Sequence, residues 1–77
     1  MESTYTLNGG VIIDLHYLVA IVPVAKTCFV DLHYQLLPKP ARLELGNRSG
    51  VLDKEEYKQE LAGIVGAWKI YKRNINR

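Results

Sequence analysis

The segment from Asp53 to about Lys72 has the pattern of an amphipathic helix, and it constrains the fold more than any other part of the chain. Its apolar residues recur at spacings of three and four, which puts them on one face: Tyr57, Leu61, Ile64, Val65, Trp68 and Tyr71. Asp53 is a typical N-cap residue, and Glu56 three positions later completes a capping-box pair. We therefore predict a helix over about residues 53–73, whose apolar face must be covered by the rest of the chain.

Small residues interrupt this predicted helix. A glycine in a helix interior costs about 1 kcal/mol relative to alanine, so a pair of them indicates that another part of the chain, or another subunit, approaches closely. Two glycines and two alanines form a small-residue band on the predicted helix. This band and the tryptophan beside it are our candidate oligomer interface: Ala62, Gly63, Gly66, Ala67 and Trp68.

The first part of the chain has the pattern of short strands joined by tight turns. Asn8-Gly9 stands between two apolar runs, which is a strong hairpin signal because both residue types tolerate positive φ. Pro23 ends a β-branched run and so marks the end of a third strand. The segment Asp14–Tyr17 is open to two interpretations, a continued strand or a turn, and we favour the turn because a strand from 11 to 22 would be unusually long. The predicted strands cover about residues 3–7, 11–15 and 18–22.

Alternation continues from Thr27 to Leu37, where Cys28, Val30, Leu32, Tyr34 and Leu36 would share one face. Pro38 and Pro40 interrupt it, and residues 42–45 alternate again as a final strand. The sequence thus predicts one α+β domain over 1–77. It consists of a small antiparallel β-meander of four or five strands (about 3–46), a turn (46–52) and one C-terminal α-helix packed on the meander.

Part of the opening resembles a known group of proteins. Leu7-Asn8-Gly9, the apolar strand that follows, Asp14-Leu15 and Leu18–Ile21 are similar to the opening of small bacterial and phage β-meander proteins, among them the FlbD-type flagellar proteins. The resemblance covers about a fifth of the chain and implies a hairpin followed by a bend. It implies no function, and the two-proline loop departs from that family's pattern.

The short length favours self-association. A chain of 77 residues buries only about 60% of its unfolded surface, and its single cysteine, Cys28, excludes an internal disulfide. With 48% hydrophobic residues there is apolar surface to spare for a subunit interface. The N-terminus lacks the pattern of a signal peptide, and the apolar run 18–24 is too short to cross a bilayer. We expect a cytoplasmic homo-oligomer without membrane contact.

No motif points to catalysis, a metal or a cofactor. The tetrapeptide Asp-Leu-His-Tyr occurs twice, at 14–17 and 31–34, and in extended strands it would put each aspartate beside its histidine. Such pairs can bind a metal or transfer protons, but the simpler interpretation is a carboxylate paired with an imidazole on a polar strand face. Cys28 alternates in register with apolar residues and is expected to be a buried thiol. We therefore predict that the protein is not an enzyme.

With catalysis set aside, the sequence is compatible with three functions, which we give in order of preference. The first is a small regulatory module, an accessory protein of phage or bacterial origin, that binds an anionic small molecule or nucleotide between subunits. Its candidate ligand residues lie in two loops: Lys39, Arg42, Asn47 and Arg48. The second is nucleic-acid binding by the C-terminal tip, whose last seventeen residues contain four bases and no acid: Lys69, Lys72, Arg73 and Arg77. The third is a structural adaptor that binds another protein.

Overall fold

The computed structural model describes residues 3–7, 10–48 and 51–75, and for 47–48 and 51–52 only the backbone. In this part of the chain the strands are β1 (Thr4–Thr6), β2 (Ile12–Asp14), β3 (Leu18–Pro23), β4 (Phe29–Tyr34), β5 (Ala41–Glu44), β6 (Asn47–Arg48) and β7 (Val51–Leu52), and the helix is α1 (Lys54–Ile75). All strand pairs are antiparallel. The predicted α+β class, an antiparallel meander on a C-terminal helix, is confirmed.

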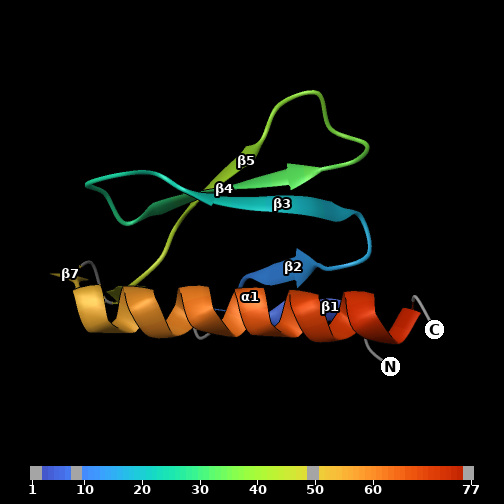
Figure 1. The fold of residues 1–77 in the computed structure, drawn as a ribbon. Helices are drawn as coiled ribbons and strands as arrows, with labels where there is room; N and C mark the ends of the chain where they lie inside the picture. Colours follow the sequence, from blue (N-terminus) through green and yellow to red (C-terminus); the bar gives the residue numbers. More distant parts are fainter. Residues whose placement is uncertain (1–2, 8–9, 49–50, 76–77) are drawn as a thin grey trace.

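The strands form separate small sheets (Figure 1). β1 pairs with β2, β3–β4–β5 form the meander, and β6 pairs with β7 beside the start of α1. The 22 residues of α1 correspond to about 33 Å of helix, and the molecule is 40 Å long. The helix α1 thus runs along most of the molecule. β7 lies beside its first turns, and β2 lies above its C-terminal half (Figure 1).

The helix begins where the sequence predicts. The Oδ1 atom of Asp53 accepts hydrogen bonds from the backbone N–H groups of Glu55 (2.9 Å) and Glu56 (3.3 Å), so Asp53 is the N-cap. The helix extends to Ile75, two residues beyond the predicted end. Within the apolar stripe Ile64 and Tyr71 are buried, and the others that pack against the core are Tyr57, Leu61 and Trp68.

The core lies between α1 and the inner faces of the sheets. Its buried members come from the β1–β2 hairpin, the bend after it, the meander, the segment that follows β5, and the helix: Leu7, Ile13, Leu15, Leu18, Val30, Leu32, Leu45, Ile64 and Tyr71. The alternation predicted for β4 holds for Val30 and Leu32. The strand ends at Tyr34, however, so Leu36, which the pattern assigned to the same face, is exposed.

The hairpin of β1 and β2 is present, with Tyr5 opposite Ile13. The Asn8-Gly9 pair that predicted it lies outside the described residues. The segment after β2 is a bend, as favoured from the sequence, because the Oδ1 atom of Asp14 accepts the N–H of His16 (2.8 Å) and turns the chain. The N–H of Gln35 then donates to the carbonyl of Tyr17 (2.8 Å), which fixes the bend to the end of β4.

The predicted turn over 46–52 contains the short β6–β7 hairpin. It starts at Gly46, whose φ of +69° lies in the left-handed region that favours glycine. The N–H of Gly46 donates to Oε1 of Glu60 (2.7 Å), and its carbonyl accepts the N–H of Asp53 (2.8 Å). These bonds bring the chain back onto the start of the helix, a tertiary constraint that the turn-forming composition does not reveal.

Candidate functional site

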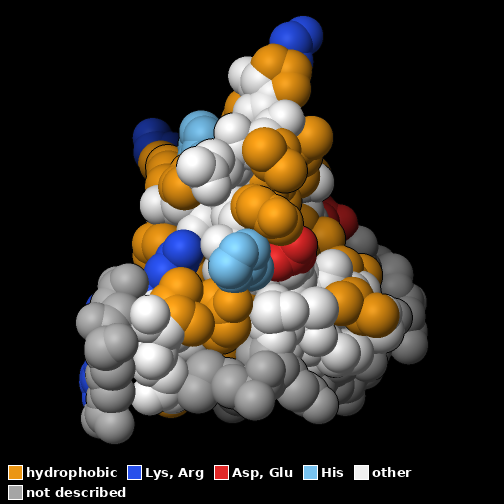
Figure 2. Space-filling view, turned by 90° about the vertical axis from the view of Figure 1, so that its right-hand side faces the viewer, with side chains coloured by type: hydrophobic (Ala, Val, Ile, Leu, Met, Phe, Trp, Pro, Cys, Tyr) orange, Lys and Arg blue, Asp and Glu red, His pale blue; other side chains and the backbone are white. Residues whose placement is uncertain are grey.

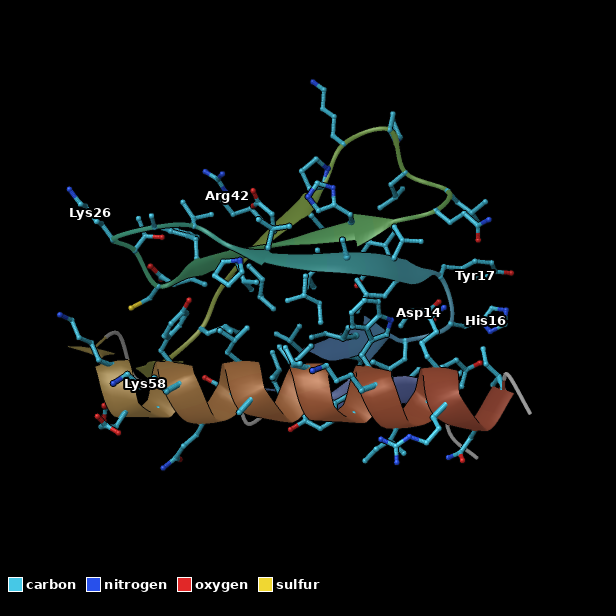
Figure 3. All side chains as sticks on the ribbon, viewed as in Figure 1. Asp14, His16, Tyr17, Lys26, Arg42 and Lys58 are labelled. Carbon is cyan, nitrogen blue, oxygen red and sulfur yellow. The ribbon has the colours of Figure 1, made fainter. Side chains whose placement is uncertain are left out.

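A pocket of about 570 Å³ lies between the turn that joins β3 to β4 and the first turns of α1. Three of its described lining residues are lysines, and the described lining consists of Lys26, Thr27, Cys28, Lys54, Tyr57 and Lys58. Figure 3 shows Lys26 on the hairpin and Lys58 on the helix at the same end of the molecule. We call this set the lysine pocket.

The hairpin side of the lysine pocket is held by a compact turn. The N–H and the Oγ1 of Thr27 both donate to the carbonyl of Val24 (3.3 and 2.9 Å), and the N–H of Phe29 donates to Oγ1 of Thr27 (3.1 Å). Lys26 takes the position of this turn that requires positive φ, at +65°. A residue with a side chain pays about 1–2 kcal/mol there that glycine would avoid. The chain therefore has a lysine at the tip despite the conformational cost.

The helix side presents two lysines one turn apart. Lys54 and Lys58 are four positions apart and so project from the same face of α1. Lys58 lies 3.8 Å from a carboxylate oxygen of Glu55, but both side chains are more than 70% exposed, and such a pair is weak and screened by solvent. The ammonium of Lys58 can therefore turn to a ligand at little cost.

The electrostatics of the lysine pocket favour an anion. Its described lining residues include three cationic groups and no carboxylate, and the acidic residues of this end, Asp53, Glu55 and Glu56, belong to the N-cap and the first turn of α1. Tyr57 adds a phenol that can donate a hydrogen bond to a phosphate or carboxylate oxygen, whereas the hydroxyl of Thr27 already donates to the carbonyl of Val24. Cys28 is partly buried in the wall. Among the described residues no group of three or more His, Cys, Asp or Glu side chains is placed to hold a metal.

Two of the ligand residues proposed from the sequence, Lys39 and Arg42, belong to the β4–β5 loop and to β5 and do not line the lysine pocket. Arg42 forms a two-point ion pair with Asp31 (Nε to Oδ1 2.9 Å, Nη2 to Oδ2 3.2 Å) on the meander, and its guanidinium lies 5.9 Å from the ring centre of Phe29. Hydrogen bonding to Arg42 holds the pKa of Asp31 below its ordinary value. Lys39 is exposed in the loop between β4 and β5, on the side of the meander away from α1 (Figure 1). The side chains of Asn47 and Arg48 lie outside the described structure.

The sequence contains little that would reveal the lysine pocket. The spacing of Lys54 and Lys58 is visible, but it is typical of any exposed helix face. Lys26 stands alone in a short loop and joins them only because the β3–β4 turn folds over the start of α1.

The basic C-terminal tip forms a second cationic surface. Trp68, Lys69, Lys72 and Arg73 line a shallow hollow of about 290 Å³. The indole N–H of Trp68 donates to the carbonyl of Leu18 (2.9 Å), and the ammonium of Lys72 donates to the carbonyl of His16 (3.3 Å). Three of the four bases named from the sequence thus line one hollow with Trp68, and Arg77 lies outside the described residues.

The small-residue band on α1 is divided between two environments. A Cβ atom on Gly63 would collide with the hydroxyl of Tyr5 from β1, so this glycine serves a contact within the chain. Gly66 has open space where a Cβ would be, Ala62 is exposed, and Ala67 packs against the core. The close approach that the glycines indicated is therefore made, at Gly63, by the β1–β2 hairpin.

The two copies of Asp-Leu-His-Tyr have different conformations. The first forms the bend after β2, where Nδ1 of His16 lies 2.6 Å from the hydroxyl of Tyr71. The second lies in β4, where Asp31 pairs with Arg42. In the second copy Asp31 and His33 are two residues apart in β4, as the extended interpretation required, and the pKa of Asp31 is lowered by Arg42 above all and also by His33. The first copy does not adopt this arrangement, because Asp14 uses its carboxylate to turn the backbone.

Comparison with family models, with curated proteins and with solved structures found no match to this chain. Within the described residues, no helix is both long and apolar enough to cross a lipid bilayer. The function is therefore argued from the chemistry of the surfaces above.

Proposed function

We propose that this protein is a small binding module for an anionic small molecule, with a phosphate ester or nucleotide as the ligand class, and that the lysine pocket is its site. The observation that supports the proposal is the convergence of Lys26, Lys54 and Lys58 on one pocket whose described lining residues include no carboxylate. Its volume of about 570 Å³ is within the range of small-molecule sites, about 300–1,000 Å³.

Each part of the pocket has a distinct task in this proposal. The ammonium groups neutralise phosphate oxygens. The partly buried ring of Tyr57 offers an apolar surface for the uncharged part of the ligand. We propose binding and not catalysis because the lining contains no histidine or carboxylate that would act as a base for Thr27 or Cys28.

The proposal holds for a monomer and for an oligomer alike, because all six lining residues belong to one chain. The intersubunit pocket expected from the sequence is not required. Self-association stays a prediction, and sedimentation velocity at micromolar concentration, with and without pyrophosphate, measures it independently of the site.

Titration with pyrophosphate and with ATP, followed by NMR chemical shifts at low ionic strength, tests the site. We expect shifts centred on residues 26–28 and 54–58, and adenosine without phosphate should bind much more weakly. The double variant Lys54→Ala/Lys58→Ala should weaken pyrophosphate binding by at least roughly tenfold. Lys69→Ala, at the other end of the helix, is the matched control. Equal weakening by the control, or full binding by the double variant, would contradict the proposal.

A second candidate function is the binding of single-stranded nucleic acid at the C-terminal tip. The observation that favours it is the hollow that Trp68 lines together with Lys69, Lys72 and Arg73, since stacking on an aromatic ring beside phosphate-binding cations is how such strands are held. Trp68 is the single tryptophan, so its fluorescence reports binding directly.

Oligonucleotide binding should quench this fluorescence and weaken steeply with salt. Lys69→Ala/Arg73→Ala should weaken it, whereas Lys54→Ala/Lys58→Ala should not. Unchanged fluorescence with a micromolar oligonucleotide at low salt excludes this candidate.

A further inference from the structure

A third hollow, of about 250 Å³, lies at the opposite end of the molecule from the lysine pocket. It opens between the bend that follows β2 and the segment that follows β4, and its lining residues are Asp14, Tyr17, Tyr34, Leu36 and Leu37. Figure 2 views this end directly and shows an acidic side chain beside a histidine, with hydrophobic side chains gathered above them. Figure 3 places Asp14 and Tyr17 there.

The charge of this hollow is negative and comes from one group. Among the described lining residues, Asp14 is the single charged one. One of its oxygens accepts the N–H of His16, and within the described chain no lysine or arginine forms an ion pair with it. Lys72, the base that reaches this region, donates to the carbonyl of His16. An anionic ligand would therefore be repelled, and a cation would be attracted.

The remaining lining is aromatic and apolar. Tyr17 packs edge-on against His16, with ring centres 4.7 Å apart and planes at 86°, and such a neighbour covers at most one of the two faces of the phenol ring. Partial burial raises the pKa of the Tyr34 hydroxyl, so this second phenol is neutral at physiological pH. Leu36 and Leu37 are 71% and 53% exposed, so the hollow presents apolar side chains to solvent.

One carboxylate beside aromatic and apolar side chains favours one class of cation over the others. A metal ion requires several oxygen or nitrogen ligands, and the hollow offers one carboxylate. An alkylated ammonium group carries its charge inside an apolar shell. It is held by phenol faces, apolar side chains and a single counter-charge, the pattern of sites that recognise quaternary ammonium.

We propose that the hollow at Asp14, Tyr17 and Tyr34 binds an alkylated ammonium group, either on a small amine or on a methylated lysine side chain. Asp14 supplies the counter-charge, the two tyrosine rings supply the π faces, and Leu36 and Leu37 cover the alkyl groups. The proposal is independent of the lysine pocket, because the two sites share no residue.

The test is an NMR titration of the full chain with tetramethylammonium chloride, and with sodium chloride at the same ionic strength as the reference. We expect saturable shifts at residues 14–17 and 34–37 with tetramethylammonium alone. A neutral compound of similar shape, tert-butanol, should bind much more weakly. A short peptide that carries trimethyllysine, compared with the same peptide carrying unmodified lysine, distinguishes the two sources of the group.

Conservative variants separate recognition from folding. Asp14→Asn keeps the oxygen that accepts the N–H of His16 but removes the charge, and Tyr17→Leu keeps an apolar side chain but removes the π face. Each should weaken tetramethylammonium binding by roughly tenfold. Tyr17→Phe should retain binding, and Glu55→Gln, at the other end of α1, is the control for net charge. Absence of saturable shifts in the wild type, equal binding of tert-butanol, or unchanged binding by Asp14→Asn would overturn the proposal.

Discussion

The hydroxyl of Tyr71 lies 2.6 Å from Nδ1 of His16, which joins the last turns of α1 to the bend between β2 and β3. Two neighbouring hydrogen bonds reinforce the connection, from Trp68 to the carbonyl of Leu18 and from Lys72 to the carbonyl of His16. The bend is thus held by side chains of the helix. The hollow that contains Asp14 and Tyr17 depends on this attachment for its shape.

Removal of the Tyr71–His16 hydrogen bond should destabilise the protein. We expect Tyr71→Phe, which keeps the buried ring, to lower the free energy of unfolding by about 1 kcal/mol. His16→Ala should cost a similar amount, and the double variant should cost less than the sum of the two. Urea denaturation followed by circular dichroism measures all three. Strictly additive effects would show that the two groups do not interact.

The same substitution at two glycines of α1 should have opposite effects. Gly66→Ala meets no neighbouring atom and should stabilise the protein by roughly 0.5–1 kcal/mol, because alanine is the better helix former. Gly63→Ala places a Cβ against the hydroxyl of Tyr5 and should destabilise it. Tyr5→Phe removes that hydroxyl, so it should rescue Gly63→Ala in part. Thermal unfolding of the four variants gives the comparison, and stabilisation by Gly63→Ala alone would be inconsistent with the Tyr5 contact.

Gly46→Ala should be among the most destabilising single changes. Its φ is positive, and a Cβ would lie 2.5 Å from the carbonyl oxygen of Asp53 and 2.8 Å from the backbone nitrogen of Tyr57. Since backbone atoms cannot move aside as a side chain can, we expect a loss above about 2 kcal/mol. Gly10→Ala is the control, because Gly10 has a similar φ of +87° but open space around it. Chemical denaturation of both should give the larger loss at position 46.

The ion pair on the meander should make the titration of Asp31 depend on Arg42. The hydrogen bond from Arg42 lowers the pKa of Asp31 below its ordinary value of 3.8. A lowered pKa means that the stabilising contribution is complete above pH 3.8 and is lost as the pH falls through the folded-state value. NMR titration of the carboxyl carbon should show a midpoint below 3.8, and Arg42→Gln should raise it. Arg73→Gln should leave the midpoint unchanged, and a midpoint that does not respond to Arg42→Gln would refute the pairing.

Local patterns in the sequence predicted the elements that depend on local chemistry. Asp53 caps the helix because its carboxylate reaches N–H groups two and three residues away, and the apolar stripe follows helical spacing. The two identical tetrapeptides show where such reasoning fails. Local preferences are the same at 14–17 and 31–34, so the difference between bend and strand comes from their tertiary surroundings.

The candidate sites were harder to predict from the sequence, because each combines segments that lie far apart in the chain. The lysine pocket joins a hairpin tip at Lys26 to the helix at Lys54 and Lys58, and no spacing rule connects these positions. The glycines of the helix correctly indicated a close approach, but its partner, Tyr5, was not predictable without the packing of β1 on α1.

The attachment of the bend to the end of α1 also has a consequence for the order of synthesis. The partners of His16 and Leu18 lie 50 to 56 positions later in the chain. At about 5–20 residues per second, a ribosome makes the bend roughly 3–10 seconds before it makes those partners. During that interval Leu18, fully buried in the finished molecule, has no helix to cover it. The nascent β segment should therefore be a ligand for chaperones that bind apolar chain, until the last turns of α1 are released.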